Sequence, residues 1–117
     1  MSFEKAAVEP FMVGSYRELT TLAKGTGLEA HHVGQQALMK KFISDYNFMT
    51  APAILVSKFG HTLGSGVVSR STRGFINARQ VVARDVLELR RVYAVPNSQL
   101  IELIQMNKQM YPKAFMK

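Results

Sequence analysis

Apolar residues recur along the second half of this chain at the spacing of an α-helix. Val82, Val86, Leu89 and Tyr93 follow one another at intervals of four, three and four positions. This spacing places all four side chains on one face of a helix. The pattern therefore predicts a helix over residues 77–93 whose apolar face is turned toward a core.

A second helix is expected beyond Pro96, because proline ends the preceding helix and Asn97 or Ser98 is able to cap the next one. We expect this helix to end before Pro112, which cannot continue it. Its apolar positions are Leu100, Leu103, Ile104 and Met110.

The first half of the chain alternates between short helical and extended patterns. Residues 1–14 carry a proline and a glycine and predict an irregular arm. Ser15 is a favourable N-cap for a short helix that ends at the Gly25–Gly27 turn. Residues 28–33 then form a short extended segment, and residues 35–45 have apolar positions at helical spacing, which predicts a helix.

A buried strand is predicted at residues 53–57, where the run AILVS is apolar and partly β-branched. Residues 64–66, which follow His61, are only weakly helical in pattern. The chain of 117 residues is long enough for one core but not for two. We therefore predict a single domain over residues 1–117 with an α+β fold that is mainly helical.

Composition excludes several classes of protein and favours one class of partner. The chain has no cysteine, which excludes disulfides and thiolate metal sites. No apolar run approaches the ~20 residues of a membrane-spanning helix, and no secretory signal is visible at the N-terminus. The formal net charge is +7, and a small domain this basic attracts polyanions, so nucleic acid is the favoured partner.

The three histidines lie within residues 31–61, and two of them are adjacent. In an extended segment, His31 and His32 point to opposite faces, so one imidazole is able to bind a metal while its neighbour accepts a proton from water. If the two strands pair, the end of the second brings His61 to the side of His31. A metal-free acid–base pair of histidines, and purely structural histidines, are alternatives that the same residues allow.

The segment from Gly25 to Val33, which contains Ala30-His31-His32, resembles the Ala-His-His signature of nucleases in the HNH/endonuclease VII superfamily. Family members occur as C-terminal toxin domains of bacterial polymorphic and contact-dependent inhibition toxins. Three other blocks of the family also have similar segments in this chain. The first is similar to residues 15–19, the second to residues 51–54 together with 61–65, and the third to the basic helix over 77–93.

The resemblance implies a ββα-metal core in which a strand carries the histidine pair. It implies that His31 is a metal ligand, His32 the general base, and His61 a second ligand or a phosphate contact. This chain departs from the family pattern at Gly60, where many relatives have an acid, and at Ser65, where a third histidine would stand. Ser65, Glu29 or water must then complete the metal shell, which favours Mg²⁺ over Zn²⁺.

Arginines downstream of the histidines are candidate phosphate contacts, because the guanidinium binds phosphate in a bidentate manner. The SRSTRG loop with Arg70 and Arg73 is the preferred segment, and Lys58, Arg84 and Arg91 are further candidates. An alternative for Arg84 is a solvated ion pair with Glu88 one helical turn away. Asp85 we interpret as structural.

Together these features predict a metal-dependent nuclease toxin, with DNA slightly favoured over RNA as the substrate. We expect it to act in the cytoplasm of a target bacterium as the C-terminal part of a larger secreted protein, and to be neutralised by an acidic immunity protein. A metal-independent ribonuclease or tRNase toxin with the same histidines is the first alternative. A non-catalytic nucleic-acid-binding protein is the second.

Overall fold

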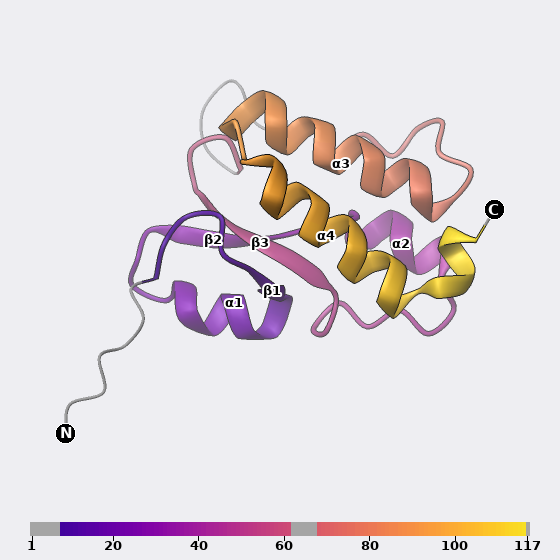
Figure 1. Ribbon diagram of the computed structural model, residues 1–117, viewed down its shortest axis with the longest axis horizontal. Coiled ribbons are helices and arrows are strands. Elements are labelled where there is room, and N and C mark those ends of the chain that lie inside the picture. The colour runs from indigo at the N-terminus through magenta and orange to yellow at the C-terminus, as the bar shows by residue number, and fades with distance from the viewer. Residues whose placement is uncertain (1–7, 62–67, 117) are drawn as a thin grey trace.

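The computed structural model describes residues 8–61 and 68–116 of the chain. Helices and short strands alternate along this part of the sequence (Figure 1), and the α+β class with mainly helical content is confirmed. The elements in chain order are β1 (Val13–Ser15), α1 (Tyr16–Ala23), β2 (Leu28–His32), α2 (Gln36–Phe42), β3 (Pro52–Ser57), α3 (Ala78–Tyr93), α4 (Asn97–Met110) and the short 3-10 helix η1 (Pro112–Phe115).

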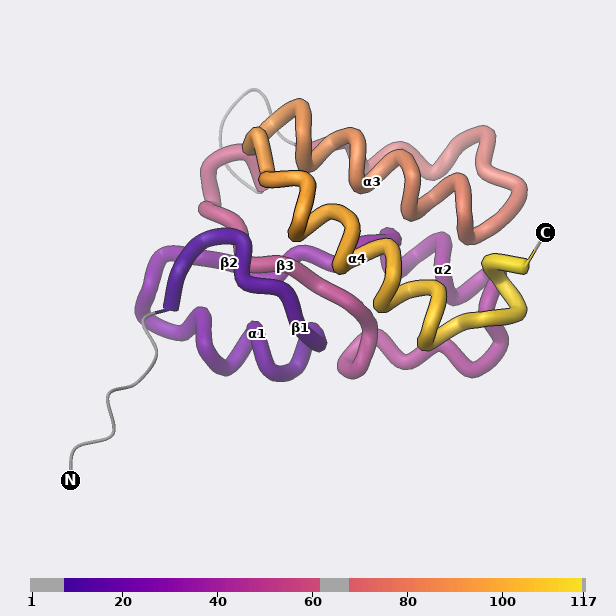
Figure 2. The backbone as a smooth tube through the Cα atoms, in the orientation of Figure 1, coloured from indigo at the N-terminus to yellow at the C-terminus, as the bar shows by residue number. Residues whose placement is uncertain are grey.

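The three strands form an antiparallel sheet in the order β1-β3-β2. Figure 2 shows the chain running out through β2 and back through β3, so that the two strands lie side by side. Because β3 is the central strand, both of its faces are covered, and residues 52–56 are buried. The predicted buried strand at 53–57 is therefore confirmed, and β2 is left with one unpaired edge.

The two faces of β3 belong to two different clusters of apolar side chains. Ala53 and Leu55 pack against Leu19 and Ala23 of α1. On the other face, Ile54 and Val56 contribute to the larger cluster formed with α2, α3 and α4, and Figure 1 shows α1 and the α3–α4 pair on opposite sides of the sheet. The alternation of side chains along a strand accounts for this division.

The prediction of an irregular arm over residues 1–14 is wrong at the C-terminal end of that range. Val13 to Ser15 form β1 and pair with β3 from Ile54 to Pro52. This edge of β3 would otherwise leave buried backbone groups without hydrogen bonds, and a three-residue strand is enough to satisfy them. Residues 1–7 lie outside the described part of the chain, as does the weakly helical segment at 64–66.

The helix boundaries follow their capping residues in two cases. The Ser15 side chain accepts a hydrogen bond from the backbone N–H of Glu18, as an N-cap does. Asn77 caps α3 in the same way, through the N–H of Gln80. The N-cap of α4 is Pro96, so the prediction that Asn97 or Ser98 caps this helix is wrong.

The helix predicted over residues 35–45 is shorter in the structure. It ends at Phe42, and Ile43 takes an extended conformation that buries its side chain. The apolar stripe predicted on α3 is confirmed, since Val82, Val86 and Leu89 are buried in the larger cluster. Among the helices described here, none combines the length and apolar character that spanning a bilayer requires.

Candidate active site

The histidine pair lies on β2, and alternation along this strand sends its two rings to opposite faces, as predicted. Leu28 and Ala30 face α1 and belong to the smaller apolar cluster. Glu29 and His31 face the other side, where both meet His61. The strand pairing therefore brings His61 beside His31, as the sequence predicted.

His31 is shielded from solvent and lies near basic side chains. Its Nε2 atom is shielded from solvent and has no hydrogen-bond partner among the residues that the structure describes. Its ring meets the ring of His61 edge to face, with the centroids 4.9 Å apart. Burial, followed by the positive charges of His61 and Arg70, lowers the pKa of His31 to about 3. The imidazole is therefore neutral at physiological pH.

His61 forms a dyad with a carboxylate from the neighbouring strand. The Nδ1 atom of His61 lies 2.8 Å from Oε1 of Glu29. A carboxylate only accepts hydrogen bonds, so Nδ1 of His61 is the donor in this pair. A carboxylate that orients an imidazole in this way is a common partner of metal-bound or basic histidines.

The turn before His61 requires a glycine at position 60. Gly60 has φ +88°, and a Cβ atom at this position would lie 2.6 Å from the side chain of Val92. Both the backbone conformation and the lack of space demand glycine. An acidic residue here would disrupt the turn that carries His61.

His32 lies in an aromatic environment on the α1 face. Its ring stacks on Tyr16, with the centroids 4.0 Å apart and the planes 10° from parallel. The Nε2 atom lies 2.9 Å from the backbone carbonyl oxygen of Phe48, so Nε2 donates and Nδ1 keeps the lone pair. Burial lowers the pKa of His32, and the Phe48 carbonyl partly opposes this shift.

Both histidines of the pair nevertheless border one cleft of about 280 Å³ at the unpaired edge of β2. Neighbouring residues on opposite faces of an edge strand can reach such a cleft from its two sides. The other residues that line it are Tyr16, Ala30, Gln35, Gln36, Ala37, His61, Ser69, Arg70 and Asp85.

Arg84, expected as a nucleic-acid contact, is instead bonded within the chain. Its guanidinium donates to the carboxylate of Asp85 at 2.7 Å, to the carbonyl of Ser71 at 2.8 Å and to the side chain of Gln35 at 2.6 Å. Gln35 in turn donates to the carbonyl of Arg70. Arg84 therefore fastens the SRSTRG loop to α3 and to the start of α2.

The ion pair between Arg84 and Glu88 that the sequence offered as an alternative is wrong. Glu88 accepts hydrogen bonds from Arg91 at 2.6 Å and from the backbone N–H of Ser69 at 2.6 Å. The hydrogen bond from Arg91 lowers the pKa of Glu88. Glu88 is thus a second link between α3 and the SRSTRG loop. It also forms an ion pair with Arg91, which is one of the predicted nucleic-acid contacts.

The remaining basic candidates lie at the rim of the site. Arg70 is exposed and donates to the backbone carbonyl of His61 at 3.0 Å. Arg73 is exposed in the same loop. Lys58 is exposed on the other side of His61, where it lines a second cleft together with that histidine.

Asp85 is a site residue whose place in the cleft the sequence reasoning missed. Its carboxyl group is buried and lines the histidine cleft, and its Oδ2 atom has no hydrogen-bond partner in the described part of the chain. Burial raises the pKa of Asp85 to about 6, although Arg84 opposes the shift. The sequence did contain a signal for a buried role of Asp85, because this residue lies one helical turn from both Val81 and Leu89. Acids are almost never buried on the apolar face of a helix without a specific partner or role.

His31 and His61 are the two candidate ligands for a divalent ion at this site, and their rings lie edge to face with the centroids 4.9 Å apart. The unpartnered Nε2 of His31 supplies one donor, and the orientation of His61 by Glu29 supplies the other. No cluster of three or more such ligands occurs within residues 8–61 and 68–116, and Ser65 lies outside these ranges.

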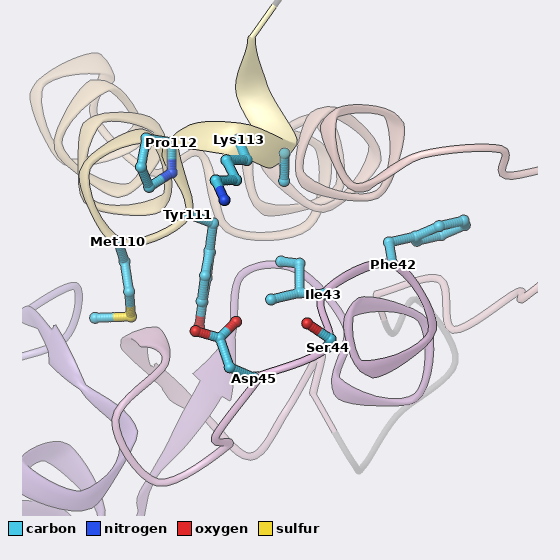
Figure 3. A pocket seen from close by; sticks show the side chains of 9 residues that line it. Phe42, Ile43, Ser44, Asp45, Met110, Tyr111, Pro112 and Lys113 are labelled. Carbon is cyan, nitrogen blue, oxygen red and sulfur yellow. The ribbon is translucent and has the colours of Figure 1, made fainter.

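A larger cavity, of about 600 Å³, lies away from the histidines. It opens between the end of α2 and the junction of α4 with η1, where Tyr111 and Asp45 point toward one another (Figure 3). Tyr111 is buried, and burial raises its pKa to about 12. This cavity contains no histidine, so the candidate chemistry stays with the cleft at β2.

Comparison with known proteins finds no significant match to this chain, whether with protein-family models, with curated protein sequences or with solved structures.

Proposed function

We propose that this chain is a metal-dependent nuclease whose active centre is the cleft at the unpaired edge of β2. One observation carries the proposal. The neutral ring of His31, whose buried Nε2 has no hydrogen-bond partner in the described chain, contacts the ring of His61, which Glu29 orients, and His32 borders the same cleft.

In this proposal His31 and His61 hold the divalent ion and His32 is the general base. The hydrogen bond from Nε2 of His32 to the Phe48 carbonyl fixes the tautomer that leaves Nδ1 free to accept a proton from water. A bound ion would stabilise negative charge on the phosphate and on the leaving oxygen. Glu29 keeps the His61 ring in place and its Nδ1 protonated.

The metal proposed first is Mg²⁺, because two protein ligands leave most of the coordination shell to water. Imidazole donors also suit Mn²⁺ and Zn²⁺, so the assays include all three ions. The proposed substrate is nucleic acid, which the charge of +7 attracts. The preference for DNA, the toxin role and the acidic immunity protein rest on the resemblance of the histidine segment.

The metal-independent ribonuclease is the weaker alternative. Such an enzyme needs one protonated imidazole near neutral pH to act as the general acid. His31 cannot fill that role with a pKa of about 3. Only His32 and His61 would remain as the acid–base pair.

A cleavage assay on supercoiled plasmid and on total RNA tests the proposal, with EDTA and with Mg²⁺, Mn²⁺ or Zn²⁺ added back. The proposal expects cleavage that EDTA abolishes and that one of the ions restores. RNA cleavage in EDTA would support the alternative ribonuclease. Failure to cleave either substrate with any of the three ions would contradict both enzymatic functions and leave the non-catalytic binding protein.

A further inference from the structure

Two clefts meet beside His61 at the unpaired edge of β2. The first is the histidine cleft, and the second has a volume of about 440 Å³. Tyr16, Ala30 and His61 border both. A polymer bound in the first cleft can therefore extend past His61 into the second cleft.

Three parts of the chain line the second cleft. Tyr16 and Thr20 belong to α1, residues 28–30 to β2, and Lys58 follows β3. Lys24, at the end of α1, also lines it. Both lysines are exposed, whereas the acid of this lining, Glu29, is paired with His61.

The size of this cleft limits what enters it. Pockets of roughly 300–1,000 Å³ enclose single small molecules, so about 440 Å³ suits one nucleotide unit. A base-paired duplex is read through its grooves by elements that protrude into it, and a concave pocket does not do this. An unpaired nucleotide, by contrast, places its phosphate on lysines and its base on an aromatic ring.

We propose that the cleft lined by Tyr16, Lys24 and Lys58 is a subsite for one unpaired nucleotide that lies next to the scissile phosphate. Lys24 and Lys58 bind its phosphate, and the base lies against Tyr16, whose ring is already held by its stack on His32. This inference rests on the proposed nuclease function and deepens it. It makes a single-stranded or locally unpaired nucleic acid the substrate class.

The test measures binding in EDTA, so that no cleavage intervenes. Fluorescence anisotropy is recorded with a labelled octathymidylate and with a 12-base-pair duplex for wild type and for two double variants. The site variant is Lys24→Gln/Lys58→Gln. The matched control is Lys40→Gln/Lys108→Gln, which removes two exposed lysines of α2 and α4 that line neither cleft.

We expect wild type to bind the octathymidylate more tightly than the duplex. The site variant should weaken octathymidylate binding at least ~10-fold and reduce its log–log salt slope by about 0.7, which corresponds to the one phosphate that the two lysines neutralise. The control variant should change the affinity by less than ~3-fold, because its charges act only through the general field. Equal weakening by both variants, or tighter binding of the duplex by wild type, would overturn the subsite.

The plasmid and RNA cleavage assay distinguishes this failure from that of the proposed function. If wild type cleaves but the two lysine pairs behave alike, the nuclease stands and the subsite fails. If wild type cleaves nothing but only the site variant loses binding, the subsite stands and the nuclease fails. A Tyr16→Leu variant adds an uncharged check, since it should weaken octathymidylate binding without changing the salt slope.

Discussion

The two adjacent histidines of β2 occupy opposite environments although they share one peptide bond. His31 faces His61 and the arginines of the loop and α3, where burial and positive charge keep it neutral. His32 lies between aromatic rings and hydrogen bonds to a backbone carbonyl. In the proposed nuclease this difference would let an edge strand supply one cleft with a metal ligand and a base without placing both on the same ion.

The largest effect that tests this division is expected from His32→Ala. General-base catalysis contributes about 10²–10⁴-fold, so the cleavage rate should fall by that factor while metal binding through His31 and His61 persists. Plasmid cleavage and Mn²⁺ titration calorimetry measure the two quantities. If His32→Ala kept its activity and its melting temperature, His32 would not be the general base, and the two histidines would not have the separate roles proposed here.

The pH dependence of stability should separate the two faces next, measured by urea unfolding in EDTA. The lowered pKa of His31, about 3, gives stability that is present above pH 6.5 and lost as the pH falls. The raised pKa of Asp85, about 6, gives stability that is present below about pH 4 and lost as the pH rises. The two contributions oppose each other between pH 4 and 6 and largely cancel, whereas the lowered pKa values of His32 and Glu88 still add stability as the pH rises.

Asp85→Asn removes one side of this balance. Between pH 4 and 6 the stability of the variant should rise more steeply than that of wild type, by about 1.4 kcal/mol per pH unit, since the opposing contribution of Asp85 is gone. Asp45→Asn, which changes an exposed carboxylate outside the histidine cleft, is the matched control and should keep the wild-type profile. A wild-type profile for Asp85→Asn would mean that the pKa of Asp85 is not raised in the folded chain.

Several features of this arrangement were predictable from the sequence. Helical spacing predicted the buried face of α3, and Ser15 caps α1 as expected. Strand alternation separated His31 from His32. These properties depend on local periodicity, which a single sequence records. The position of His61 beside His31 was predicted only on the condition that β2 and β3 pair, which local periodicity does not determine.

The features that the sequence did not reveal depend on long-range contacts. β1 has three residues and exists because β3 needs a partner on that edge. The hydrogen bond between Arg84 and Gln35 joins residues 49 positions apart. The partner of His32 is a backbone carbonyl, and any residue at position 48 would present the same atom, so no pattern of side chains signals it.

Glu29→Gln should have an intermediate effect confined to the His31 side. Loss of a carboxylate that orients a metal-binding histidine lowers metal affinity by about 10–100-fold, and Mn²⁺ titration calorimetry measures it. Glu102→Gln on the exposed face of α4 is the control, which should leave the affinity unchanged. Equal metal affinity in Glu29→Gln and wild type would indicate that His61 does not bind the ion.

The smallest effect is expected on the His32 side, from Tyr16→Leu. This change keeps an apolar side chain over the smaller cluster but removes the ring stacked on His32. An aromatic pair contributes about 0.5–1.5 kcal/mol beyond its buried area, so thermal unfolding should show a melting temperature lower by a few degrees. An unchanged melting temperature would mean that the stack of Tyr16 on His32 does not stabilise the fold, and the position of the His32 ring would then have to depend on its hydrogen bond to the Phe48 carbonyl alone.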